Sequence, residues 1–241
     1  QIRVHSGTYQ PPRRGQALIW FNARHDGIIL EAVGDVILTA ANANLASIDE
    51  ASFPAVVNHV VYFGDGITGQ TVLRGFRITG ANHFTDSSAR AESIEPHAND
   101  DERLRPGRFF YSDGGAIKIF GRSYPTIEDV DVVDNFASPC AGGISIEHRG
   151  FKEGSVQIRD SRFFRNRAQV TGSAIDLLPG SSAVLKNCLF VGNVSNTGVD
   201  YISPPGHGYL GLHGSGSVTV MKGSSIEIIR CTFTGNWNGV D

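Results

Sequence analysis

The sequence predicts an all-β protein, a right-handed single-stranded parallel β-helix (a solenoid) of about six coils. Two observations carry this prediction. One unit recurs along the chain, and the apolar residues within each unit alternate with a period of two rather than a helical period. A single unit cannot bury its own apolar face, whereas stacked copies can.

Each unit opens with small residues followed by an apolar-alternating run, and it closes on an asparagine. The four clearest openings lie at 114–119, 142–146, 172–177 and 216–220. The closing residues Asn135, Asn166, Asn193 and Asn236 are separated by 31, 27 and 43 residues. The first two spacings match one turn of a three-strand solenoid, and the third matches one turn plus an insertion.

The expected strands follow from these units. Residues 1–56 are the least regular part, with strands expected at 2–9, 27–32 and 35–38, and a further coil at 61–63, 71–73 and 77–78. Each later unit holds three strands, here the first, second and third strand. Residues at the same place in each unit should stack as inward columns. On the first strand this column is Ile117, Ile144, Ile175 and Val218, and on the third it includes Phe163, Phe190 and Phe233.

Turn residues also recur at fixed places. Gly75, Asp129, Asp160, Asn187 and Arg230 separate the second and third strands, and Gly, Asn and Asp tolerate the left-handed backbone of a tight turn. We expect the closing asparagines to form a hydrogen-bonded ladder that satisfies turn backbone, rather than to bind a ligand.

The G-G-A-I run at 114–117 and the F-x-x-N runs at 190–193 and 233–236 resemble the repeats of the pectin-lyase-like right-handed parallel β-helix superfamily. Similar repeats occur in polymorphic outer-membrane and adhesin proteins of bacteria. The resemblance implies an extracellular, periplasmic or cell-surface location. It does not fix an activity, because this fold hosts lyases, hydrolases, epimerases, tailspikes and adhesins. The catalytic motifs of these enzymes are absent from the sequence, so no catalytic residue is carried over.

Composition bounds the protein further. The chain has 241 residues, 40% hydrophobic and 19% charged, with a net charge of -3. Without a basic excess nucleic acid is not an expected partner, and no apolar stretch reaches the ~18 residues of a membrane span. We expect one β-helix domain over 1–241, part of a longer chain, because it begins on a strand and ends without a cap.

The three cysteines are expected to be free thiols rather than to form a disulfide. Cys188 and Cys231 hold the same place in their units and should stack on neighbouring coils ~4.8 Å apart. Because a disulfide needs Cβ atoms at roughly 3.8 Å, a buried thiol pair is the simpler expectation. Cys140 lies in a turn with no evident partner.

Two insertions, at 82–113 and 195–215, fall on the same edge of the stack and should wall a trough over the outer face of the first strands. Alternation places two rows of side chains on the floor of this trough. The first row is Tyr62, Lys118, Ser145, Asp176 and Thr219, and the second is Phe120, Glu147, Leu178 and Met221, with His148 and Arg149 just beyond.

The trough is the candidate site. Lys118, Glu147 and Asp176 are the candidate catalytic residues, since two carboxylates can act as acid and base in sugar hydrolysis. Alternatively Lys118 or Arg149 takes a proton next to a uronate, with a cation or Ca²⁺ neutralising the carboxylate. The candidate substrate-binding residues are Tyr62, Ser145, His148, Arg149, His207 and His213. The competing interpretation is that these are ordinary solvated residues of a solenoid surface.

Two functions therefore remain open. The first is a secreted or surface protein that binds a polysaccharide in the trough, with cleavage as a lyase or hydrolase. The second is a non-catalytic structural or adhesin-like module whose coil ends are covered by further chain, another domain or a neighbouring subunit. No cofactor is required by either function, apart from the Ca²⁺ considered above.

Overall fold

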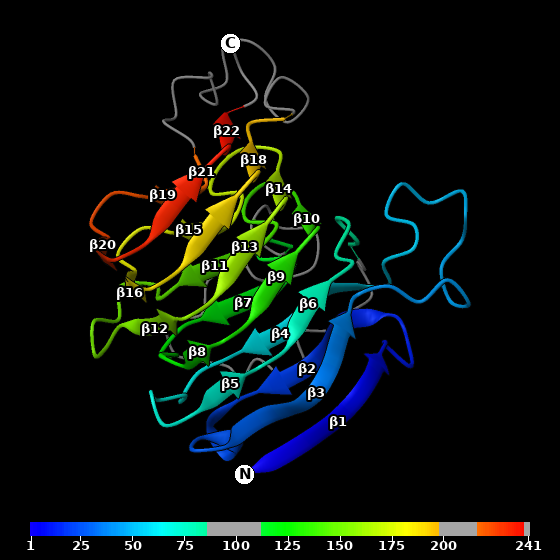
Figure 1. Ribbon diagram of the computed structural model, residues 1–241, viewed down its shortest axis with the longest axis horizontal. Coiled ribbons are helices and arrows are strands. Elements are labelled where there is room, and N and C mark those ends of the chain that lie inside the picture. Colours follow the sequence, from blue (N-terminus) through cyan, green and yellow to red (C-terminus); the bar gives the residue numbers. More distant parts are fainter. Residues whose placement is uncertain (86–111, 198–215, 239–241) are drawn as a thin grey trace.

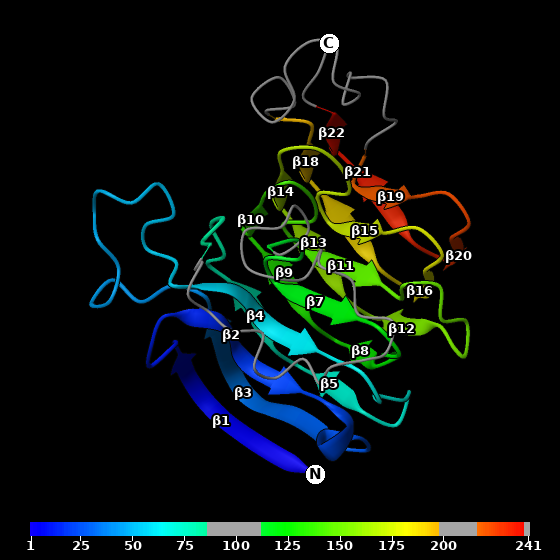
Figure 2. The same cartoon turned by 180° about the vertical axis from the view of Figure 1, so that it is seen from behind.

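The computed structural model describes residues 1–85, 112–197 and 216–238. Within them the chain is all-β, and the one helical element is a short 3-10 turn, η1 (Ala23–His25). Strands of successive repeats lie side by side, from β1 near the N-terminus to β22 near the C-terminus (Figures 1 and 2). Most of both predicted insertions, with His207 and His213, lies outside the described residues.

The five predicted first strands lie in a six-stranded parallel sheet, whose sixth strand, at 15–21, was not predicted. Its order is β2 (Gly15–Phe21), β4 (Val57–Phe63), β7 (Ile117–Phe120), β11 (Ile144–Glu147), β15 (Ile175–Leu177) and β19 (Val218–Val220). The register aligns Ile117 with Ile144, Ile144 with Ile175, and Ile175 with Val218. The predicted inward column is therefore confirmed, and its three isoleucines are fully buried.

The second and third strands belong to one strongly curled sheet of twelve strands. One arm is β5 (Val72–Arg74), β8 (Thr126–Glu128), β12 (Val156–Arg159), β16 (Ser182–Lys186) and β20 (Ser225–Ile229). The other arm is β6 (Arg77–Thr79), β9 (Asp131–Val133), β13 (Arg162–Phe164), β17 (Leu189–Val191) and β21 (Thr232–Thr234). Both arms meet at β3 (Ile29–Thr39), which also pairs with β1 (Ile2–Tyr9).

The strand β3 corrects the expected N-terminal pattern. Two separate strands were predicted at 27–32 and 35–38, but the chain forms one strand over both. Its first residues pair with β5 and its last residues with β6. Gly34 lies between these parts with a φ of 81°, a conformation that glycine adopts without a steric penalty, so the strand changes direction without ending.

A third parallel sheet was not predicted. It contains β10 (Phe136–Ala137), β14 (Arg167–Ala168), β18 (Val194–Ser195) and β22 (Trp237–Asn238), each directly after a closing asparagine. The later repeats thus hold four strands instead of the expected three. Two residues are too few to show an alternating pattern, so the sequence gives no periodic signal for these strands.

The predicted turns and the asparagine ladder are confirmed. Asp129, Asp160, Asn187 and Arg230 have φ values of 49°, 53°, 54° and 50°. In the ladder, the backbone N–H of each of the first three asparagines donates to the side-chain Oδ1 of the asparagine in the next repeat. The distances are 3.2 Å from Asn135 to Asn166, 3.0 Å from Asn166 to Asn193, and 3.0 Å from Asn193 to Asn236.

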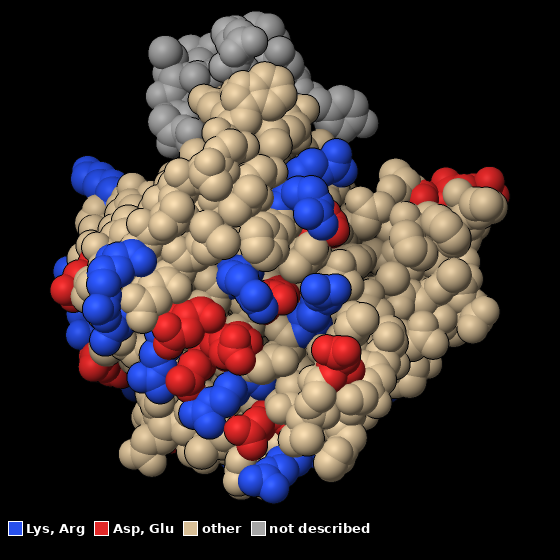
Figure 3. Space-filling model, viewed as in Figure 1, with Lys and Arg blue, Asp and Glu red and all other residues tan. Residues whose placement is uncertain are grey.

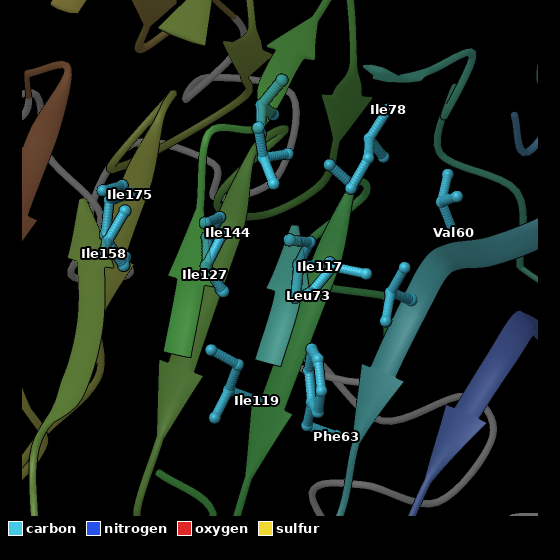
Figure 4. Packing of buried hydrophobic residues seen from close by; sticks show 14 of the residues in the cluster. Val60, Phe63, Leu73, Ile78, Ile117, Ile119, Ile127, Ile144, Ile158 and Ile175 are labelled. Carbon is cyan, nitrogen blue, oxygen red and sulfur yellow. The ribbon is translucent and has the colours of Figure 1, made fainter. Parts of the chain in front are cut away.

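The apolar core lies between the sheets (Figure 4), where columns of Ile, Val, Leu and Phe from successive strands pack together. The predicted phenylalanine stack is confirmed. The ring centroids of Phe163 and Phe190 lie 4.7 Å apart, and those of Phe190 and Phe233 lie 4.4 Å apart. Burying each such side chain contributes ~1.5–3 kcal/mol. Cys188 and Cys231 are free thiols, as predicted, with the Cys188 N–H 3.4 Å from Cys231 Sγ.

The outer face of the twelve-stranded sheet carries charged side chains of both signs (Figure 3). Arg74 contacts Glu31 and Glu128 on the neighbouring strands, and Arg162 forms two hydrogen bonds with Asp131. These pairs are partly exposed and contribute little individually, because water and salt screen them. Among the described residues, no helix is long and apolar enough to cross a membrane.

Candidate functional site

The outer face of the six-stranded sheet carries the predicted row of side chains. The parallel register aligns Tyr62 with Lys118, Lys118 with Ser145, Ser145 with Asp176, and Asp176 with Thr219. The next row, with Phe120 opposite Glu147, has the predicted alignment as well. Alternation along the strands therefore predicted correctly which residues share this face.

The expected exposure of this face was wrong. Tyr62, Lys118, Ser145 and Asp176 are 0% exposed, and Glu147 is 2% exposed. Period-two alternation identifies the side of a sheet on which a residue lies, but it does not show what packs over that side. Lys, Asp and Glu are almost never fully buried unless they are paired, so the interpretation as ordinary solvated residues fails.

Lys118 is the centre of the buried polar contacts. Its Nζ lies 3.0 Å from Glu147 Oε2 and 3.2 Å from Ser145 Oγ, so the ammonium donates to both oxygens. An ion pair removed from water to this extent keeps its charges only because each partner compensates the other. Two of the three candidate catalytic residues are thus brought into direct contact.

Asp176, the third candidate, lies beside a different set of side chains. The Thr171 hydroxyl lies 3.0 Å from Asp176 Oδ2 and also 3.0 Å from Cys140 Sγ. The backbone N–H of Cys140 donates in turn to Asp113 Oδ1 at 2.9 Å. Cys140, expected to have no partner, is therefore buried between two polar side chains.

The residues Asp113, Cys140 and Thr171 were not predicted as part of the site. All three hold the same place in their repeats, four residues before Ile117, Ile144 and Ile175. Each is followed by a residue with positive φ, namely Gly114 at 83°, Ala141 at 50° and Gly172 at 59°. This turn directs the preceding side chain against the outer face of the sheet. Comparing that repeat position across the units would have revealed the column.

Burial changes the protonation of the acidic groups. It raises the pKa of Asp176 to about 6, although hydrogen bonds from Thr171 and Cys140 oppose the rise. Burial also raises the pKa of Asp113 well above its usual range, against the opposing effect of the Lys118 charge. The pKa of the Cys140 thiol is likewise raised well above its usual value by burial. A thiol that remains protonated is a poor nucleophile, so the raised pKa does not favour Cys140 as a nucleophile.

Several buried atoms at this face have no hydrogen-bond partner within the described residues. They include Asp113 Oδ2, Asp176 Oδ1 and Thr219 Oγ1. Asp176 and Thr219 are register partners on the adjacent strands β15 and β19. Buried polar atoms are normally satisfied, and a hydroxyl-rich ligand or water could supply the missing partners.

Among the candidate binding residues, His148 has hydrogen-bond partners within the fold. The Nε2 atom of His148 lies 3.0 Å from the Ser123 carbonyl oxygen, and its Nδ1 accepts the N–H of Ser182 at 3.3 Å. Both ring nitrogens therefore have partners within the fold, and burial lowers the pKa of His148 to about 4, so the ring is neutral at neutral pH.

Tyr62 and Arg149 pack against aromatic rings. The Tyr62 ring lies 4.6 Å from that of Trp20, a row neighbour that was not predicted. The Arg149 guanidinium lies 5.1 Å from the Phe120 ring. Among the described residues no group of three or more His, Cys, Asp or Glu side chains could hold a metal ion. The acidic residues at 86–102, in the first insertion, lie outside the described residues.

Comparison with known proteins identifies no relative: no family model, no curated protein and no solved structure matches the chain.

Proposed function

We propose that the chain is a right-handed parallel β-helix of about six coils, related to the pectin-lyase-like proteins that its repeats resemble. The support is the register of the three parallel sheets. Residues at equivalent places in consecutive repeats pair with one another in each sheet, such as Ile144 with Ile175, Phe163 with Phe190, and Phe136 with Arg167. One repeat per coil produces this pattern.

The proposed function is binding and hydrolysis of a polysaccharide at the outer face of the six-stranded sheet, in an extracellular, periplasmic or cell-surface location. One observation carries the proposal. A buried Lys118–Glu147 ion pair lies one strand away from Asp176, a buried carboxyl group whose pKa is raised to about 6. Strongly perturbed titratable groups that gather on one rigid surface are typical of functional sites.

The two carboxyl groups suit different roles. Asp176 retains its proton up to about pH 6, so it can donate that proton to the leaving oxygen of a glycosidic bond. Glu147, paired with the Lys118 ammonium, is the carboxylate that would activate water. A pair of acids in different environments is the usual arrangement for hydrolysis of a glycosidic bond.

Hydrolysis is favoured over elimination by the state of Lys118. A lyase mechanism would require Lys118 to accept a proton from the sugar. An ammonium that donates to Glu147 and Ser145 has no lone pair with which to accept one. Lys118 instead holds Glu147 in place. Because all three side chains are enclosed, local opening must precede substrate binding.

The test is a screen of neutral and acidic polysaccharides for release of reducing ends, followed by three variants on any active substrate. Asp176→Asn and Glu147→Gln should each lower kcat by about 10²-fold or more, since each removes one proton-transfer group. Gln157→Ala, a change on the twelve-stranded sheet, is the matched control and should leave kcat unchanged. Activity that survives in both Asp176→Asn and Glu147→Gln would refute the assignment.

A second candidate function rests on a separate observation. The last described strand of each large sheet leaves members of the inward columns exposed, with Val220 at 42%, Ile228 at 47% and Phe233 at 44%. Strand edges with open backbone groups and apolar side chains pair readily with further strands. This favours a module that assembles through its coil ends onto a second copy of the chain.

Light scattering of the chain at increasing concentration tests this second candidate. Assembly predicts a mass that rises above the monomer, and Ile228→Asp should restore the monomer because a charge would be buried at the contact. A parent protein that stays monomeric at high concentration would exclude the assembly.

A further inference from the structure

The four-stranded sheet has an outward-facing row of side chains that the site described above does not use. Parallel pairing aligns Phe136 with Arg167, Arg167 with Val194, and Val194 with Trp237. The second residue of the first three strands (Ala137, Ala168 and Ser195) is buried. The outer row, defined as Phe136, Arg167, Val194 and Trp237, is therefore the exposed side of this sheet, and the Trp237 side chain is 55% exposed.

A groove of about 400 Å³ lies at the Phe136 end of the outer row. Its lining includes Phe136, Arg167, Asn82, Asp134 and Arg165. Asn82 is bridged to Phe136 in parallel register, so the groove continues the line of the outer row. The row and the groove together form one elongated surface that runs across the strands.

The charge of this surface is not balanced. Arg165 is neutralised by Asp134 through two hydrogen bonds of 2.7 Å. Arg167 forms no ion pair with any described carboxylate, and its guanidinium lies 5.2 Å from the Phe136 ring centroid. A guanidinium stacked on a ring keeps its in-plane N–H groups available, in a geometry that matches carboxylate and other oxyanions.

We propose that the outer row and its groove bind an anionic polysaccharide, one that carries carboxylate or sulfate groups. Trp237 provides an exposed apolar ring for the face of a sugar ring, and Arg167, stacked on the Phe136 ring, binds the acidic group. Three strand spacings of ~4.8 Å separate Phe136 from Trp237, so the row spans ~14 Å, the length of an oligosaccharide rather than of one sugar. This surface is separate from the buried Lys118–Glu147 pair, so the proposal does not depend on hydrolysis.

Calorimetric titration with polygalacturonate, heparin and the neutral glucan pullulan tests the proposal. The parent protein should bind at least one anionic polymer and should bind pullulan much more weakly. Arg167→Gln should lower the affinity for the anionic polymer about tenfold or more, because a charged hydrogen bond is lost. Trp237→Ala should lower this affinity roughly two- to tenfold. Preference for polygalacturonate identifies carboxylate as the bound group, and preference for heparin identifies sulfate.

One control separates this surface from general charge. Arg159→Gln removes an equal charge from the exposed face of the twelve-stranded sheet. This variant should bind the anionic polymer as the parent does. The proposal is overturned if neither anionic polymer binds, if pullulan binds equally well, if Arg167→Gln has no effect, or if Arg159→Gln weakens binding as much.

Discussion

The asparagine ladder is expected to contribute measurably to the free energy of unfolding. The Asn166 side chain is fully buried and connects three successive repeats. Its Oδ1 accepts from the N–H and the Nδ2 of Asn135 at 3.2 and 3.1 Å, and its Nδ2 donates to the carbonyl oxygen of Val132 and to Asn193 Oδ1 at 2.9 and 3.0 Å. Asn166→Ala removes all four contacts at once.

The expected loss of stability follows from the buried backbone groups that lose their hydrogen-bond partners. The buried N–H of Asn135 loses its hydrogen-bond acceptor, and the carbonyl oxygen of Val132 loses a donor. Each buried group left unsatisfied costs ~1–3 kcal/mol. We expect Asn166→Ala to lower the free energy of unfolding by about 4 kcal/mol, measured by urea denaturation with an unchanged m-value.

Asn236→Ala is the matched control. Asn236 is at the last described position of the same ladder and is only half-buried, so water can replace its contacts. Its loss should cost about 1 kcal/mol. The reasoning is refuted if Asn166→Ala costs less than about 1 kcal/mol, or no more than Asn236→Ala.

Three further predictions concern other parts of the chain. Lys118→Met should lower the free energy of unfolding, measured in urea, by about 3–5 kcal/mol, because the buried Glu147 carboxylate loses its partner. The double variant Lys118→Met/Glu147→Leu should recover most of that loss, and equal instability of the two variants would contradict this. Burial raises the pKa of the Cys188 thiol to about 12. This thiol should therefore resist thiol reagents at pH 8 in the folded protein and react after unfolding. Rapid labelling of Cys188 in the native chain would disprove this. Arg162→Ala breaks an exposed pair with Asp131 and should cost under ~1 kcal/mol, less at high salt; a larger, salt-independent loss would show that the pair is not screened.

Much of the stacking could be predicted from the sequence because it depends on repeat position alone. Ile117, Ile144 and Ile175 follow small residues at the same place in each unit, and the structure aligns them in one column. Each closing asparagine follows a third strand at a fixed distance, and the ladder forms as expected. Where a pattern recurs in every repeat, local and long-range preferences agree.

The burial of the site, its neighbouring residues and the shortest strands could not be predicted from repeat position. The enclosure of Lys118 and Asp176 is set by what lies over the sheet, which alternation cannot show. Cys140 and Thr171 belong to the site through a turn with positive φ at Ala141 and Gly172, a position where the unit carries no apolar signal. The strand at 136–137 is too short for any period to appear.

We propose that burial on the outer face of the six-stranded sheet makes Asp176 a proton donor beside the Lys118–Glu147 pair. Carbon-13 NMR of protein labelled at the aspartate carboxyl carbons, with Asp176→Asn to assign the signal, measures this protonation directly. The Asp176 carboxyl should titrate with a midpoint near pH 6. A midpoint near 4, the ordinary value for aspartic acid, would show that Asp176 is ionised in the folded protein and is no proton donor.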